Sequence, residues 1–173
     1  MRKVKVSRVS KVKPPKASYR AENRFMRLAI EEARKGIYNG EGGPFGCVIV
    51  KEGRIVGRGH NRVLSCCDST HHGEIAAIRH AEKRLGTHDL NGCEVYTTGE
   101  PCMMCLAACI WANVSRIYYG CTIEDNSLIG FRDGEMDARF VKRENAGELL
   151  VQTDREACLE LFSEYAGMDK TVY

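Results

Sequence analysis

The stretch HGEIAAIRHAEKRLGTHDLNGCEVYTTGEPCMMC, residues 72–105, decides the fold. Residues 73–85 have the apolar spacing of a helix, and residues 93–98 are typical of a strand. A further predicted helix, apolar nearly all round, opens at Cys102. One helix and one strand therefore separate His72 from Cys102, and this connection can bring two helix N-termini side by side.

The flanking sequence continues the alternation of helices and strands. Helical spacing predicts further helices at residues 22–35 and 154–166. Short β-branched or apolar runs predict strands at residues 47–50, 54–59, 116–121 and 148–152. Residues 122–147 are polar and are predicted to be irregular. This order of elements predicts an α/β layered fold.

Three side chains in the central stretch have the pattern of a catalytic zinc site. His72 can supply a nitrogen ligand, and Cys102 and Cys105 lie three residues apart, on one face of a helix. Three protein ligands leave the fourth tetrahedral position open, as in catalytic zinc sites. Glu74 can point at a water on the metal and act first as general base, then as general acid.

Two other interpretations compete for these residues. A C-x-x-C pair alone is also typical of redox chemistry or of core packing. A fourth cysteine could close the zinc site and make it structural, the candidates being Cys66, Cys67, Cys93, Cys109 and Cys121. A closed site has no use for Glu74, and the joint H-x-E and P-C-x-x-C pattern is the signature of zinc deaminases.

On these motifs, the chain resembles the cytidine deaminase-like superfamily over about residues 22–121. The resemblance implies a three-layer α-β-α sandwich with a five-stranded mixed sheet and one zinc ion per subunit, bound by His72, Cys102 and Cys105. It assigns the proton shuttle to Glu74. The Gly59-His60-Asn61 segment matches a loop whose asparagine binds the base, which assigns substrate binding to Asn61.

Within the superfamily, the chain is most similar to bacterial guanine deaminases. Gly42-Gly43-Pro44-Phe45-Gly46 matches a segment whose phenylalanine, here Phe45, packs near the base, and Glu100-Pro101-Cys102 has the form found in guanine and tRNA-adenosine deaminases. The resemblance implies that Asp125 helps to move a proton to the leaving amine. It also implies a homodimer whose swapped C-terminal segment closes the site with an aromatic residue, here Tyr173.

The expected function is hydrolytic deamination of guanine to xanthine and ammonia, with zinc-activated water as the nucleophile. Gly73 and the Gly-His-Asn loop are similar to fungal cytosine deaminase, which keeps cytosine and the nucleosides guanosine and cytidine open as substrates. A tRNA-adenosine deaminase would use the same zinc site. A non-enzymatic binding module stabilised by structural zinc is the remaining alternative.

Charge and cysteine content bear on partners and location. Residues 1–20 hold eight basic side chains and no acidic one, so removing them from the net charge of +3 leaves the remainder at −5. An acidic body is a poor platform for nucleic acid, and we expect a small-molecule partner. We predict a flexible basic extension at residues 1–18 and a deaminase domain at residues 19–173. Nine cysteines, no signal peptide and no apolar run long enough to span a membrane predict a cytoplasmic protein.

Overall fold

The computed structural model describes residues 22–142 together with Arg155 and Leu159. The predicted basic extension and the strand predicted at residues 148–152 lie outside the described residues. So do Tyr173 and most of the helix predicted at residues 154–166, although Arg155 and Leu159 are both helical. The chain divides into two compact units between Asp137 and Ala138. The first unit holds the whole sheet.

The helices and strands follow one another in the order α, β, β, α, α, β, α, β, α, α. They are α1 (Arg24–Tyr38), β1 (Gly46–Lys51), β2 (Arg54–His60), α2 (Val63–Cys66), α3 (Gly73–Leu85), β3 (Cys93–Gly99), α4 (Met103–Trp111), β4 (Arg116–Cys121), α5 (Ile123–Leu128) and α6 (Asp133–Lys142). None of the described helices is long and apolar enough to cross a membrane.

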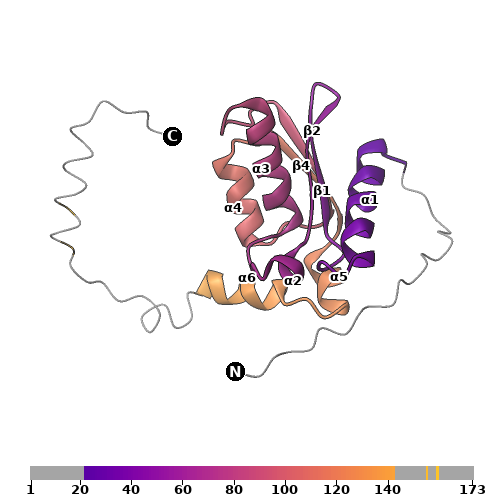
Figure 1. The fold of residues 1–173 in the computed structure, drawn as a ribbon. Helices are drawn as coiled ribbons and strands as arrows, with labels where there is room; N and C mark the ends of the chain where they lie inside the picture. The colour runs from indigo at the N-terminus through magenta and orange to yellow at the C-terminus, as the bar shows by residue number, and fades with distance from the viewer. Residues whose placement is uncertain (1–21, 143–154, 156–158, 160–173) are drawn as a thin grey trace. The chain divides into compact units, whose positions relative to one another are not determined.

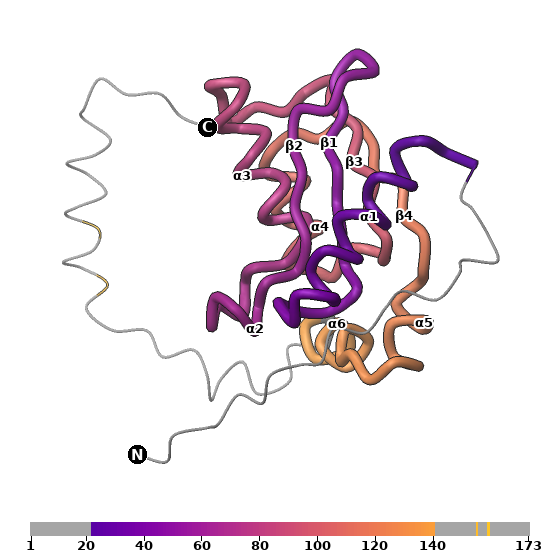
Figure 2. The backbone as a smooth tube through the Cα atoms, turned by 45° about the vertical axis from the view of Figure 1, so that its right-hand side comes forward, coloured from indigo at the N-terminus to yellow at the C-terminus, as the bar shows by residue number. Residues whose placement is uncertain are grey.

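The strands form one mixed sheet in the order β2-β1-β3-β4, which Figure 2 shows side by side. β1 pairs antiparallel with β2 and with β3, while β3 and β4 are parallel. Parallel neighbours need a crossover connection, and α4 provides it. An α/β fold with a mixed sheet is therefore confirmed. The described residues contain four strands where five were expected, and the five-stranded three-layer sandwich stays a prediction.

Helices pack on both faces of the sheet. α1 contacts one face, where Ala29 is buried with Val48, Val50 and Tyr96. α3 lies across the other face, where its alanines join Cys47, Ile49 and Val95 in the larger core cluster. Figure 1 shows α1 on one side of β1 and both α3 and α4 on the other. Since β1 is buried on both faces, nearly every residue of its apolar run lies in a core.

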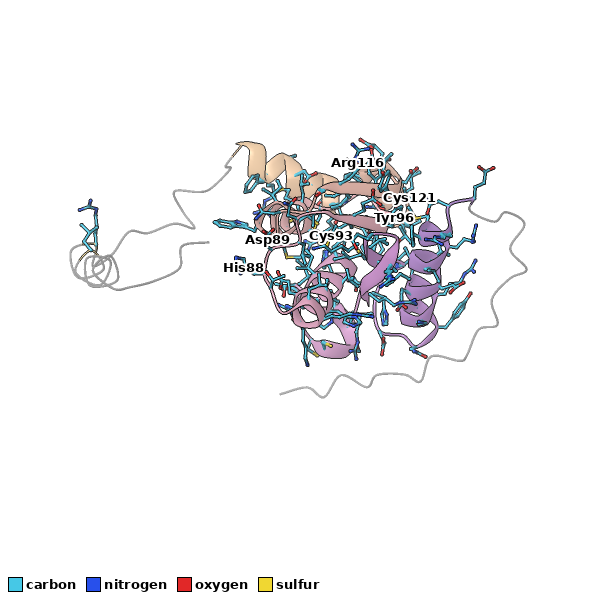
Figure 3. The ribbon with its side chains drawn as sticks, turned by 90° about the horizontal axis from the view of Figure 1, so that it is seen from above. His88, Asp89, Cys93, Tyr96, Arg116 and Cys121 are labelled. Atoms are coloured by element: carbon cyan, nitrogen blue, oxygen red, sulfur yellow. The ribbon has the colours of Figure 1, made fainter. Side chains whose placement is uncertain are left out.

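Tyrosine side chains extend the α1 side of the sheet toward its β4 edge. The ring of Tyr96 lies 5.0 Å from that of Phe25 and stacks on Tyr118 at 4.7 Å, with an interplanar angle of 16°. Figure 3, seen from above, places Tyr96 beyond Cys93 on β3, with His88 and Asp89 in the segment that leads to this strand. The aromatic contacts thus tie α1 to β3 and β4.

The prediction that residues 122–147 are irregular was wrong for their first part, because α5 and α6 lie there. Thr122 and Asp125 form a capping box, in which Thr122 Oγ1 accepts from the Asp125 backbone N–H and Asp125 Oδ2 accepts from the Thr122 N–H at 2.9 Å. Such local hydrogen bonds start a short helix without the long apolar period that predicts one.

Candidate active site

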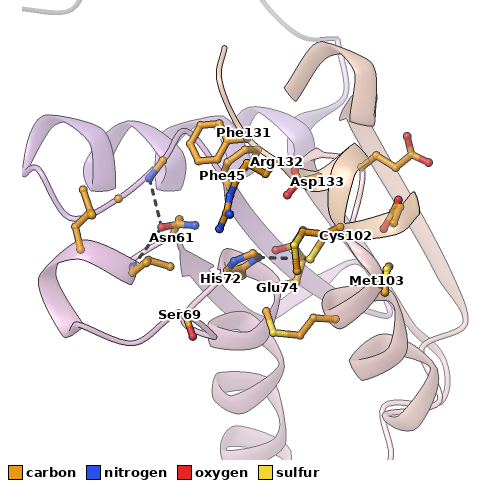
Figure 4. Close-up of a pocket in the computed structure, with 18 residues that line it drawn as sticks. Phe45, Asn61, Ser69, His72, Glu74, Cys102, Met103, Phe131, Arg132 and Asp133 are labelled. Atoms are coloured by element: carbon orange, nitrogen blue, oxygen red, sulfur yellow. Dashed lines mark hydrogen bonds between the residues drawn. The ribbon is translucent and has the colours of Figure 1, made fainter. Parts of the chain in front are cut away.

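The two predicted helix N-termini meet at one end of the sheet. His72 is the N-cap residue of α3 and Cys102 that of α4, and both have extended backbone conformations. Neither side chain makes a capping hydrogen bond within its own helix. Both side chains are therefore free to point toward the space between the two helices, which Figure 4 shows in close-up.

The geometry of His72, Cys102 and Cys105 fits a tetrahedral metal ion. The Nδ1 atom of His72 lies 3.6 Å from each of the two sulfur atoms, and the three candidate ligand atoms all lie within 4.8 Å of one another. Zinc at its usual distances from nitrogen and sulfur separates tetrahedral ligands by roughly 3.5–3.8 Å. Among the described residues no fourth ligand joins this group, which disfavours the closed structural site.

The two cysteines have unequal electrostatic surroundings. A hydrogen bond from the Cys105 thiol lowers the pKa of Cys102 to about 4, with help from His72 and against the effect of burial. As the donor of that bond, and because it is fully buried, Cys105 has a raised pKa. The hydrogen bond with Cys102 also raises the pKa of His72. A thiolate at Cys102 is the form that binds a metal.

Glu74 is held beside this group in the first turn of α3. Its side chain is buried, and its Oε1 atom accepts a hydrogen bond from Thr97 Oγ1 at 3.1 Å. Its Oε2 atom lies 3.4 Å from the Cys105 sulfur, so the single thiol proton of Cys105 has two acceptors within reach, Glu74 and Cys102. Burial raises the pKa of Glu74 above that of an ordinary glutamate. A carboxyl group in this place can exchange protons with a ligand beside Cys105.

A cavity of about 650 Å³ opens in front of these residues. Phe45 and Asn61, the described residues that were expected to bind the substrate, both line it. The Phe45 ring meets that of Phe131 edge to face, at 4.7 Å and 83°. Asn61 Oδ1 accepts from the backbone N–H groups of Gly43 and Val63, at 3.3 and 3.2 Å, so this side chain also holds the loop around it. These bonds use the oxygen and leave the amide nitrogen available to a ligand.

Two predicted site residues are not among the described residues that line this pocket. Asp125 caps α5 and is not among the residues that line the cavity. Tyr173 lies outside the described residues. The geometry therefore joins His72, Glu74, Cys102 and Cys105 with Phe45 and Asn61.

Sequence reasoning missed Arg132 and Asp133, which both line the cavity beside Phe131. Asp133 accepts a hydrogen bond from Asn126 Nδ2 at 3.0 Å, and burial raises its pKa. Figure 4 shows Asp133 on the same side of the pocket as Cys102. The sequence offered one indication of Asp133, which is an acidic residue two positions after Phe131. Apolar periodicity did not predict the helix that begins there.

Comparison with known proteins supports the site. Residues 20–121 match the family model of the cytidine and deoxycytidylate deaminase zinc-binding region. The guanine deaminase of Bacillus subtilis is 44% identical over 109 residues, which cover 63% of this chain and 70% of that protein. The tRNA-specific adenosine deaminase of Aquifex aeolicus is 41% identical over 95 residues, and the match covers 55% of this chain but only 62% of the relative.

The fold of this chain is also similar to that of a solved structure. The X-ray structure of the Bacillus subtilis guanine deaminase superposes with a TM-score of 0.66 at 32% sequence identity. The match covers 78% of this chain and 98% of the solved chain. The expected relation to the cytidine deaminase-like superfamily is thereby confirmed.

Proposed function

The chain belongs to the cytidine and deoxycytidylate deaminase zinc-binding family, hydrolases that act on C–N bonds, and we propose that its substrate is guanine. The products are xanthine and ammonia. The observation that carries this proposal is the cavity that places an aromatic wall and Asn61 in front of the His-Cys-Cys group and Glu74. The match to almost the whole of a solved guanine deaminase chain supports a small nucleobase as the ligand.

His72, Cys102 and Cys105 would hold the zinc ion. When bound by three protein ligands, zinc lowers the pKa of a water molecule in the open position to about 7 and so supplies a nucleophile at neutral pH. Glu74 would take a proton from the attacking water, whose oxygen bonds to the amino-bearing carbon, and would deliver that proton to the neighbouring ring nitrogen. Its contact with Thr97 holds the carboxyl group in place for both transfers.

The remaining pocket residues orient the base and serve the leaving group. The edge-to-face pair of Phe45 and Phe131 supplies an apolar wall against which a flat ring can pack. The amide nitrogen of Asn61, for which the described residues provide no hydrogen-bond partner, can donate to a ring acceptor. We assign the second proton, which converts the amino group to ammonia, to Asp133, because this carboxyl lines the cavity and burial raises its pKa.

The test is ammonia release by the zinc-loaded protein from guanine, guanosine, cytosine, cytidine, adenine and adenosine. We expect turnover of guanine and loss of that turnover in Glu74→Ala with zinc retained. Turnover of a different base would replace the substrate and keep the mechanism. An active Glu74→Ala variant would overturn the assignment of the proton shuttle.

A tRNA-adenosine deaminase is the second candidate, and the 41% identity to the Aquifex relative favours it. We propose that residues 19–173 form the deaminase domain, so that RNA binding would depend on the basic residues 1–18. Binding of tRNA that weakens steeply with salt and is lost when residues 1–18 are deleted would support this candidate. Ammonia release from tRNA, with none from guanine, would establish it.

We propose further that the protein is a homodimer in the cytoplasm. On α4, the side chains of Leu106, Ile110 and Trp111 are exposed, and Trp111 is 72% accessible. An exposed apolar stripe of this kind is typical of a protein interface. The cysteines of the described residues are all unpaired, which fits a reducing compartment. Light scattering should give twice the chain mass, and Trp111→Lys should reduce it to that of one chain.

A further inference from the structure

Arg132 is presented to the pocket by a backbone that is fixed on both sides. The residue before it, Phe131, packs on Phe45, and the residue after it, Asp133, accepts from Asn126. Its own carbonyl accepts from the backbone N–H of Met136 in the first turn of α6, at 3.0 Å. The side chain lines the cavity and points into it, as Figure 4 shows. The backbone that carries Arg132 is thus fixed, and its side chain faces the cavity.

The charge of Arg132 has no protein partner in the described part of the chain. The ion pairs there are formed by Glu32, Glu41 and Asp68, and none of them includes Arg132. The cavity wall nevertheless contains four carboxylate side chains, those of Glu74, Glu100, Asp133 and Asp137. One oxygen of Asp137 is buried without a hydrogen-bond partner among the described residues. The pocket wall therefore contains several carboxylate hydrogen-bond acceptors and a single guanidinium donor, that of Arg132.

This arrangement matches the two edges of a 6-oxopurine. Guanine carries donors at N1 and at the 2-amino group, and acceptors at O6 and N7. Carboxylates pair with the donors, while the planar fork of an arginine can donate to O6 and N7 together. Adenine carries an amino donor at C6, which would face the guanidinium with the wrong polarity.

We propose that Arg132 is a specificity-determining residue that reads the O6 and N7 edge and so selects 6-oxopurines over 6-aminopurines. This inference rests on the proposed function in one respect, which is that the cavity binds a nucleobase. Arg132 is the only arginine or lysine among the described residues that line the cavity. A phosphate group is usually met by several donors, so a lone guanidinium beside an aromatic wall favours a base edge over a phosphate.

Two ligands separate the recognition of the base from its hydrolysis. Hypoxanthine keeps O6 and N7 and lacks the 2-amino group, so it reports binding alone. 2-Aminopurine keeps the 2-amino group and lacks O6, so it can be hydrolysed without the full contact. The variants are Arg132→Met and Arg132→Lys, and the matched control is Arg84→Met, which removes an exposed arginine from the last turn of α3.

We expect Arg132→Met to weaken hypoxanthine binding, measured by calorimetry on the zinc-loaded protein, about tenfold or more. Arg132→Lys keeps the charge but loses the fork, and should fall between the wild type and Arg132→Met. The kcat/KM for guanine should drop about tenfold more than that for 2-aminopurine. Arg84→Met should change neither quantity.

Hypoxanthine binding that is equal in the wild type and in Arg132→Met would overturn the inference. Weaker binding of inosine monophosphate with unchanged binding of hypoxanthine would overturn it in favour of a phosphate contact. If the protein hydrolyses guanine but its preference for guanine over 2-aminopurine is the same in the wild type and in Arg132→Met, this inference is overturned and the proposed function stands. Hypoxanthine binding that depends on Arg132, without any guanine turnover, would remove the proposed substrate and leave the inference standing.

Discussion

The hydroxyl group of Thr97 on β3 donates a hydrogen bond of 3.1 Å to the carboxylate of Glu74 on α3. Both side chains are buried, so water cannot replace this bond. The helix that carries Glu74 and the strand that leads to Cys102 are thus joined directly behind the candidate metal group. This relationship makes Thr97 a positioning residue for the proposed proton shuttle, Glu74.

Replacement of Thr97 by valine should slow catalysis without releasing zinc. The variant keeps the shape of the side chain but removes the only hydroxyl donor to Glu74 Oε1 given by the structure, and such a loss costs about 1–3 kcal/mol. We expect kcat to fall about tenfold, with an unchanged KM and zinc content. Thr87→Val, at an exposed turn, is the control. An unaltered kcat would mean that Glu74 is held by its other contacts.

Zinc binding should depend on one cysteine pair and not on the other thiols. Cys102→Ser and Cys105→Ser remove candidate ligands and should reduce the zinc content, measured by elemental analysis, from about one ion per chain to a small fraction. Cys66→Ser and Cys121→Ser change exposed thiols outside the group and should keep the full content. Loss of zinc from either exposed variant would instead support a closed four-ligand site.

The metal group could be predicted from the sequence because its spacing is local in two short motifs and the connection between them is one helix and one strand. Phe45, assigned through the resemblance of its glycine-rich segment to that of guanine deaminases, lies in the pocket wall. The prediction of the metal group thus depended on two short-range patterns and on the one helix and one strand that connect them.

The opposite wall of the pocket could not be predicted in the same way. α6 is short and starts at a polar turn, so its position depends on tertiary contacts such as Phe131 on Phe45 and Asn126 with Asp133. The resemblance assigned the leaving-group proton to Asp125, which caps α5, and gave no reason to consider Asp133, which lines the cavity. The capping box of Asp125 could have been read from its spacing to Thr122.

Acid should weaken the protein through Glu32. Burial raises the pKa of this glutamate, but its hydrogen bonds and charge interactions with Lys35 and Arg58 outweigh burial and hold the pKa below 4.5. A depressed pKa stabilises the folded state above the unfolded pKa, and that stability is lost as the pH falls through the folded pKa. We expect Glu32→Gln to lower the free energy of unfolding by about 1–2 kcal/mol at pH 7.

The comparison of two pH values isolates this effect. In urea unfolding, the difference between the wild type and Glu32→Gln should shrink as the pH is lowered from 7 through the folded pKa of Glu32, because the wild-type carboxylate becomes protonated there. Glu31→Gln, exposed on the same helix, should leave the stability nearly unchanged at both pH values. A difference for Glu32→Gln that stays constant between the two pH values would show that packing, and not charge, is lost.

The packing of α3 against β2 should be sensitive to a methyl group added at Gly57. A Cβ atom there would overlap the carbonyl oxygen of Ala77 and lie 2.9 Å from the Cβ of Ala81, so the helix must move away from the strand. We expect Gly57→Ala to reduce the free energy of unfolding by about 1–3 kcal/mol. Because His72 and Glu74 begin the same helix, the displacement should also weaken zinc binding.

Gly134→Ala is the matched control, since its Cβ would meet nothing closer than 3.5 Å and alanine favours a helix. Thermal unfolding and zinc titration of both variants decide the matter. If Gly57→Ala were as stable as Gly134→Ala and bound zinc equally well, α3 would not be held against β2 by this contact.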